Sequence, residues 1–133
     1  MDFAAIGTVW GPRVLSILRI VAGLLLLQYG LAKLFGWPAV EMFENLRWSS
    51  LFGIAGMFEL IGGALLTLGL FIRPVAFILS GEMAAAYFIE HFPHSFFPVL
   101  SGGDLAVSLC FTFFYLAFAG GGPWSFDAMR EKG

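Results

Sequence analysis

Long apolar segments alternate with short polar ones along this chain, at lengths typical of membrane spans. A helix that crosses a bilayer needs about 20 mostly apolar residues. Four segments approach this length, and each is bounded by glycine, proline or charged residues. The pattern predicts an all-α fold, a four-transmembrane-helix bundle in one domain that covers residues 1–133. The expected spans are residues 14–35, 51–71, 74–91 and 104–119.

The intervening segments are expected to lie outside the hydrocarbon layer. Residues 39–50 contain Glu41, Glu44, Arg47 and Trp48. They predict a short interfacial segment between the first two helices, because tryptophan favours the headgroup level. The stretch HFPHSFFPVLSGG predicts a loop, since it holds two prolines and two glycines. The tail WSFDAMREKG is polar and is expected outside the bilayer.

The composition supports a membrane protein. Hydrophobic residues make up 59% of the chain and charged residues 12%, whereas an average soluble domain is roughly half apolar and about a quarter charged. The net charge of −2 and the lack of a basic patch give no reason to expect a nucleic-acid partner. Arg19 interrupts the first apolar segment, so we interpret that segment as a retained span rather than a signal peptide.

The distribution of Lys and Arg predicts the orientation in the membrane. An even number of spans puts both termini on one side. The positive-inside rule then predicts that both termini are cytoplasmic, because cytoplasmic loops carry an excess of Lys and Arg. The basic residues expected on that side are Arg13, Arg73, Arg130 and Lys132, against Lys33 and Arg47 on the other.

The second span carries one carboxylic acid, Glu59, inside the apolar run IAGMFELIGGALLTLGL. Residues three, four, seven and eight apart share a helix face. Glu59 therefore shares a face with Gly56, Gly62 and Gly63. Small residues let membrane helices approach closely, so this face is predicted to pack against a neighbour. Glu59 is thus expected to point into the protein.

Each of the other spans also has a polar side. Arg19 and Lys33 share a stripe on the first span, and Glu82 lies near the middle of the third. If these sides face inward, the interior holds Glu59, Glu82 and Arg19. The fourth span then adds Thr112 and Tyr115 as hydrogen-bond partners. Lys33, Asp104, His91 and His94 are expected at the outer mouth. The intramembrane polar or ligand-binding candidates are Glu59, Arg19, Lys33, Glu82, Tyr115 and Asp104.

The buried charges must be compensated. A lone charge at the bilayer centre costs about 3 kcal/mol on insertion scales. Two interior acids and one arginine must therefore pair, or an acid must hold a proton. Arg19 is the expected counter-charge of Glu59. Two interpretations remain open, a structural ion pair that fixes helix register and a proton-carrying or ligand-binding acid.

Other chemistry finds little support in the sequence. His91 and His94 lack an obvious third and fourth ligand, so no metal site is expected. The single cysteine, Cys110, excludes an intrachain disulfide and a C-x-x-C dithiol. We find no phosphate-binding loop, nucleophile elbow or dinucleotide fingerprint. No catalytic residue is identified.

The motifs taken together resemble the DoxX family of small bacterial four-span membrane proteins. The stretch YGLAKLFGW, residues 29–37, is similar to the family's G-x-x-K-L-F segment. FELIGGALLTLGLFIRP, residues 58–74, is similar to its E-x-x-G-G-x-L-L-x-x-G-L-x-x-R pattern. GGD precedes the fourth span, and the tail GGPWSFD is similar to the family's G-P-G-x-x-S-L-D ending. Lys33 and Glu59 occupy positions of these motifs.

The resemblance implies a location and a set of functions. The family takes its name from a subunit of a thiosulfate:quinone oxidoreductase, and other members resemble partners in redox-stress complexes. It implies a multi-pass protein of the bacterial inner (plasma) membrane that serves as a subunit of a quinone-linked redox system. Quinone is then the expected ligand, and a soluble redox protein or a homo-oligomer is the expected partner. The alternatives are a membrane scaffold or assembly protein without catalytic activity, and a small proton-coupled transporter.

Overall fold

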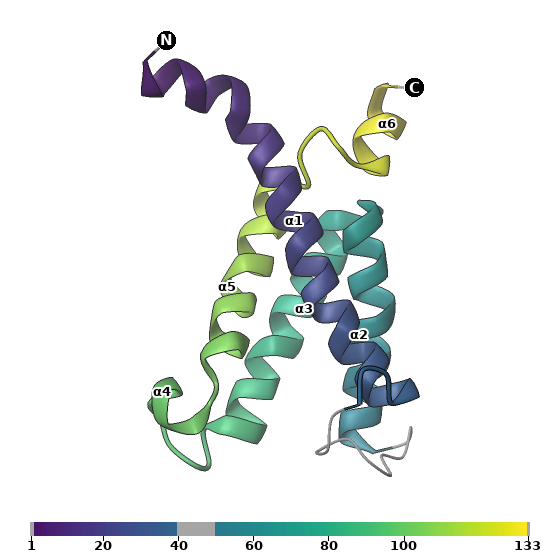
Figure 1. Cartoon of the computed structure of the whole chain (residues 1–133), viewed down its shortest axis with the longest axis vertical. Helices are drawn as coiled ribbons and strands as arrows, with labels where there is room; N and C mark the ends of the chain where they lie inside the picture. Colours follow the sequence, from purple (N-terminus) through teal and green to yellow (C-terminus); the bar gives the residue numbers. More distant parts are fainter. Residues whose placement is uncertain (1, 40–49, 133) are drawn as a thin grey trace.

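The first two helices of this chain begin at residues whose side chains cap them and end at glycines in the left-handed conformation. The computed structural model describes residues 2–39 and 50–132, and the described chain is helical with no strands (Figure 1). The predicted interfacial segment lies almost entirely outside the described residues. The helices are α1 (Phe3–Phe35), α2 (Leu51–Leu68), α3 (Ile72–Ala86), a π-helical turn (Tyr87–His91), α4 (Pro98–Ser101), α5 (Asp104–Ala119) and α6 (Phe126–Lys132).

Helix α1 is longer than the sequence pattern predicted. It begins at Phe3, whereas the predicted span begins at residue 14. The carboxylate of Asp2 caps its first turn by accepting a hydrogen bond of 2.8 Å from the backbone N–H of Ala5. Pro12 lies within the helix without ending it. The first turns of α1 extend beyond the other helices, and residues 3–12 are all exposed (Figure 1).

Helices α2 and α3 meet in a tight turn. Helix α2 begins after Ser50, whose hydroxyl accepts from the N–H of Gly53, and ends at Gly69 in the left-handed conformation at φ 80°. Glycine adopts this conformation at no steric cost. Helix α3 and the π-helical turn form one continuous segment, Ile72–His91, that begins two residues before the predicted span.

Helix α5 spans residues 104–119, as the sequence predicted. The preceding stretch, predicted as a loop, contains the four-residue helix α4. Among the described residues, three helical segments are long and apolar enough to cross a membrane, namely Phe3–Phe35, Leu51–Leu68 and Ile72–His91. Helix α5 is apolar but has 16 residues, which span about 24 Å at 1.5 Å per residue. Its crossing of the bilayer stays a prediction.

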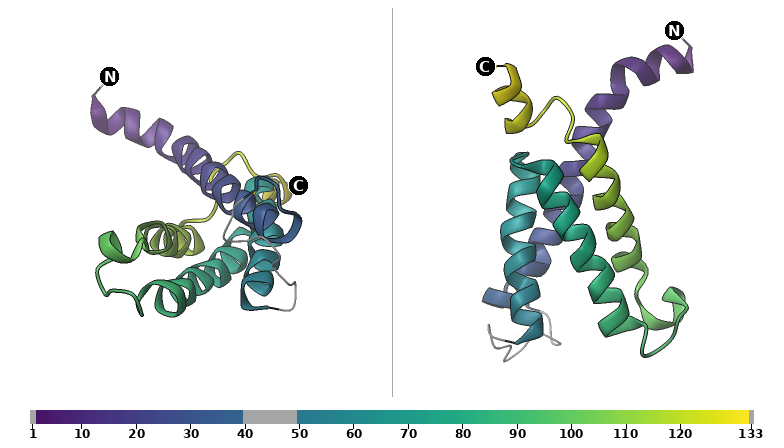
Figure 2. Two further views of the ribbon diagram at one scale, coloured as in Figure 1. Left: turned by 60° about the horizontal axis from the view of Figure 1, so that its bottom comes forward. Right: turned by 180° about the vertical axis from the view of Figure 1, so that it is seen from behind.

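The helices pack as two pairs, α1 with α2 and α3 with α5 (Figures 1 and 2). Glycines bring the backbones of α1 and α2 together. A Cβ atom built on Gly30 would lie 2.5 Å from the backbone nitrogen of Leu60, and one on Gly63 would lie 2.8 Å from that of Leu27. The prediction that the small-residue face of the second span packs against a neighbour is confirmed.

A hydrophobic core joins the two pairs, and apolar side chains also cover the outside. Core residues from all four long helices are buried, among them Leu26, Leu66, Leu79, Phe113 and Leu116. Outward-facing side chains are also large and apolar. This double apolar character fits a helical bundle whose solvent is lipid. Exposed examples are Phe77, Phe88, Phe111 and Phe118.

Both termini lie at the same end of the bundle (Figure 1). We call this the termini end. The opposite end, where α1 finishes, α2 begins and the chain passes through α4, is called the loop end. Helices α1 and α5 lie close near the termini end and diverge toward the loop end (Figures 1 and 2).

Candidate functional site

A buried ion pair joins α1 to α2 near the loop end. The ammonium of Lys33 lies 2.9 Å from Oε1 and 2.8 Å from Oε2 of Glu59. The two side chains are 9% and 2% exposed. Lys33 stands in the last turn of α1, and Glu59 stands eight residues into α2 on its glycine-rich face. Because the two helices are antiparallel and in close backbone contact, these positions meet inside the bundle.

The expected partnership of Arg19 with Glu59 is wrong. Arg19 is 1% exposed and donates to backbone carbonyls, at 2.7 Å to Gly121 and 2.7 Å to Trp124. The reason is distance along the helix. Arg19 precedes Lys33 by fourteen residues, which is about 21 Å along α1. Glu59 lies toward the loop end, whereas Arg19 lies beside Thr67 near the other end of α2.

Glu82 is the second interior carboxyl group, and its environment differs from that of Glu59. Both of its oxygens are buried without a hydrogen-bond partner. Glu82 interacts electrostatically with Glu59, Lys33 and Glu90. Of these described neighbours, only Lys33 is a cation, and its ammonium already contacts both oxygens of Glu59. The structure thus brings together three of the predicted candidates, and we call them the Lys33–Glu59–Glu82 cluster.

A cavity of about 260 Å³ opens beside this cluster, and we call it the loop-end cavity. It lies where α1 and α5 diverge, so residues of both helices line it. Its walls are mostly apolar, with a hydroxyl, an ammonium, two carboxyl groups and an imidazole among them. Such a combination is typical of small-molecule sites, which are concave and apolar with a few convergent polar groups. The polar residues of the lining are Tyr29, Lys33, Glu59, Glu90 and His91, and the apolar part includes Leu26, Met83, Leu105 and Leu109.

A second hollow, a groove, lies between α2 and α3 and reaches Glu82 of the cluster. It has a volume of about 300 Å³, and Glu82 and Glu90 are among its lining residues. Ala86 and Glu90 line both this groove and the loop-end cavity. These two residues are therefore shared by the walls of the groove and the cavity.

Tyr115 and Asp104 do not join the cluster. Tyr115 is 57% exposed, and Asp104 is exposed in the first turn of α5. The prediction assumed that the polar side of α5 faces inward. Instead the helix packs through Ala106, Leu109 and Phe113, and Thr112 donates to the carbonyl of Ser108 in its own helix. A hydroxyl that bonds its own backbone needs no partner from another helix, so packing of the apolar side chains decides which face is buried.

The histidines lie near the loop end, in different surroundings. His91 lines the loop-end cavity, and its Nδ1 lies 3.1 Å from the carbonyl oxygen of Ser101. His94 is exposed. Within the described ranges, no group of three or more potential metal-binding side chains comes together.

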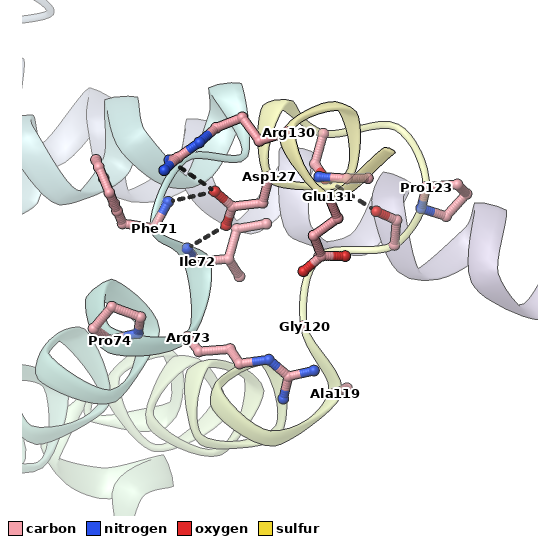
Figure 3. Close-up of a pocket in the computed structure, with 14 residues that line it drawn as sticks. Phe71, Ile72, Arg73, Pro74, Ala119, Gly120, Pro123, Asp127, Arg130 and Glu131 are labelled. Atoms are coloured by element: carbon pink, nitrogen blue, oxygen red, sulfur yellow. Dashed lines mark hydrogen bonds and ion pairs between the residues drawn. The ribbon is translucent and has the colours of Figure 1, made fainter. Parts of the chain in front are cut away.

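The charged residues of the termini end hold the C-terminal segment in place. The carboxylate of Asp127 accepts hydrogen bonds of 2.9 Å from the backbone N–H groups of Phe71 and Ile72 at the start of α3 (Figure 3). Arg73 donates to the carbonyl of Phe118 at the end of α5. A pocket of about 700 Å³ lies between these contacts, and its lining includes Arg73 and Asp127 (Figure 3). Asp127 thus anchors the C-terminal segment to α3, and Arg73 links α3 to the end of α5.

Sequence analysis missed Tyr29 and Asp127. Tyr29 lies four residues before Lys33, so the spacing rule alone places it on the same face of α1. Its hydroxyl was overlooked because the polar stripe of the first span was assigned from its two cations, Arg19 and Lys33. Asp127 belongs to the tail motif GGPWSFD, but its acceptor role depends on a turn more than fifty residues away.

Comparison with known proteins agrees with this architecture. The sequence model of the DoxX family matches residues 14–92. An uncharacterized protein of Haemophilus influenzae is 39% identical over 120 residues, which cover 87% of this chain and 90% of that protein. No solved structure matches the chain. The family match covers more than half of the chain, including α2, α3 and the Lys33–Glu59–Glu82 cluster, and the chain belongs to the DoxX family.

Proposed function

We propose that this protein is the membrane subunit of a quinone-linked redox system and that the loop-end cavity binds the quinone head group. The observation that carries the proposal is the convergence of Tyr29, Lys33 and His91 on a mostly apolar cavity, whose lining also includes Glu59 and Glu90. A quinone ring is neutral and flat, and its carbonyl oxygens accept hydrogen bonds. Apolar walls favour the ring, and a few donors orient it. Membership of the DoxX family adds an independent argument for a redox context.

The charges of the site suit a neutral ligand. Lys33 is paired with Glu59 at 2.8 Å, so its positive charge is largely balanced before a ligand enters. An anion would therefore gain little from this ammonium. Tyr29 lines the same cavity, and its hydroxyl is a second donor.

Electrons for quinone reduction would come from a redox-active partner protein. Reduction to the quinol takes two electrons and two protons. The sequence has a single cysteine, so this chain holds no dithiol of its own to supply them. Its part would be to bind and orient the quinone within the bilayer, with both termini in the cytoplasm as the Lys and Arg distribution predicts.

Quinone binding can be tested with two matched tyrosine variants. A short-tailed quinone is titrated into the purified protein, and quenching of tryptophan fluorescence reports binding. Tyr29→Phe removes one hydroxyl from the cavity lining, so the apparent Kd should rise several-fold. Tyr115→Phe removes the same atom from an exposed position and should bind like the unaltered protein. A titration without saturation in the unaltered protein, or equal affinities for both variants, would contradict the proposal.

A scaffold without chemistry of its own is the second candidate. It is favoured by the contacts of Arg19 and Asp127, which use charged side chains to fix backbone segments. A scaffold should co-purify with its partner while showing no saturable quinone response. Co-purification followed by the quinone titration therefore separates the two candidates.

A further inference from the structure

The Lys33–Glu59–Glu82 cluster contains one more acid than it has bases. Lys33 contacts both oxygens of Glu59 at 2.9 and 2.8 Å, which leaves the carboxyl group of Glu82 beside a pair whose charges already cancel. Both oxygens of Glu82 are buried and accept no hydrogen bond. An ionised carboxylate normally accepts several hydrogen bonds, and a buried one without them is very costly. The geometry therefore suits a neutral carboxylic acid at this position.

We propose that Glu82 is a proton-binding site inside the bundle and that it exchanges its proton with the loop end by way of Glu90. Removing the proton would place a second negative charge next to Glu59 with no further cation among the described neighbours. Adding it lets the acid donate a hydrogen bond toward the Glu59 carboxylate. Glu82 thus binds one proton, with Glu59 as its hydrogen-bond acceptor and Glu90 as its link to the loop end.

The route to the surface follows one side of α3. Glu90 lies eight residues beyond Glu82, and Ala86 lies between them. A methyl group at residue 86 leaves space where a larger side chain would separate the two acids. Glu82, Ala86 and Glu90 all line the groove of about 300 Å³ between α2 and α3, which has room for bridging water. Glu90 itself is half-buried in the π-helical turn at the loop end.

The neighbours of Glu82 come from several elements. Lys33 faces it from α1, Glu59 from α2 and Glu90 from the π-helical turn. Tyr29 and His91 lie beside the same cluster in the lining of the loop-end cavity. A proton on Glu82 is therefore sensitive to any ligand that disturbs the Lys33–Glu59 pair. Proton binding at Glu82 goes beyond quinone binding, because it follows from the Lys33–Glu59–Glu82 cluster and does not require a particular ligand in the cavity.

Infrared spectroscopy on the purified protein in lipid tests the proton site. At neutral pH the unaltered protein should show the carbonyl-stretch band of a protonated carboxylic acid, and the band should shift in D₂O. Glu82→Gln should abolish the band while leaving the helical fold intact, because glutamine imitates the neutral acid in size and polarity. Asp104→Asn, which changes an exposed carboxyl group of α5, is the matched control and should keep the band.

The outcomes distinguish a proton on Glu82, a proton on Glu59 and no bound proton. A band that survives Glu82→Gln but disappears in Glu59→Gln would place the proton on Glu59 and overturn the proposal, as would the absence of any band in the unaltered protein. If Glu82→Gln does not fold, ¹³C-labelled glutamate in the unaltered protein still reports one neutral carboxyl group by solid-state NMR. For the route, Glu90→Gln should keep the band and slow its H/D exchange several-fold, and an unchanged exchange rate would refute the role of Glu90.

Discussion

Replacing Glu59 by glutamine should destabilise the bundle substantially. The change keeps the size of the side chain but removes the charge that balances Lys33, whose ammonium lies 2.8 Å from the Glu59 carboxylate. The exposures of 9% and 2% place this pair among buried rather than surface ion pairs. Loss of one partner from a buried pair costs about 3–5 kcal/mol, whereas an exposed pair contributes about 0–1 kcal/mol. We therefore expect a loss of about 3 kcal/mol, which lowers the folding equilibrium constant more than about a hundredfold.

The assay is equilibrium unfolding in mixed micelles with increasing SDS, followed by tryptophan fluorescence. Lys33→Met, Glu59→Gln and the double variant complete a double-mutant cycle. The double variant should lose less stability than the sum of the two single changes, because neither charge is left alone. A loss below about 1 kcal/mol for Glu59→Gln would show that the pair behaves like a surface pair. Additivity within about 0.5 kcal/mol would show that the two side chains act independently.

Four further changes test other parts of the structure. Asp127→Ala removes the acceptor at the start of α3 and should cost about 1 kcal/mol, with faster limited proteolysis of the C-terminal tail; unchanged cleavage would contradict the anchoring role. Gly30→Ala forces a Cβ atom to within 2.5 Å of Leu60 and should cost about 1–3 kcal/mol in the same unfolding assay. Gly81→Ala is the control, because its Cβ atom would have no neighbouring atom within 4 Å, and it should be neutral or stabilising by up to about 1 kcal/mol. Equal effects of the two glycine substitutions would refute the close approach of α1 and α2. Tyr115→Phe should change stability by less than about 0.5 kcal/mol, and a larger loss would show that this hydroxyl has a buried partner.

The inward position of Glu59 could be predicted because its evidence is local. Gly56, Gly62 and Gly63 lie on its own helix face, and helical spacing converts sequence distance into direction. The same reasoning gave the bounds of α5, which depend on Gly103 and Gly120 next to the helix. Helical spacing and flanking glycines therefore predict the environment of a residue only within one or two helical turns of it.

The partner of Arg19 could not be predicted in the same way. Its acceptors are carbonyl oxygens of Gly121 and Trp124, about a hundred residues away, and any residue type could have supplied them. A charge-matching argument considers only side chains, so it assigned Arg19 to Glu59. The predicted inward position of Tyr115 is wrong for a related reason. A polar stripe on a helix does not reveal whether hydroxyl groups such as that of Thr112 already bond the backbone of their own helix.

The contacts of Arg19 also constrain the order of folding. Arg19 lies in α1, and the carbonyl oxygens that accept its hydrogen bonds at 2.7 Å lie about a hundred residues later in the chain. Until the segment with Gly121 and Trp124 has been synthesised, the guanidinium needs another partner, such as water at the interface or the Thr67 carbonyl of α2. Packing of the termini end is thus a later step of folding than the pairing of α1 with α2.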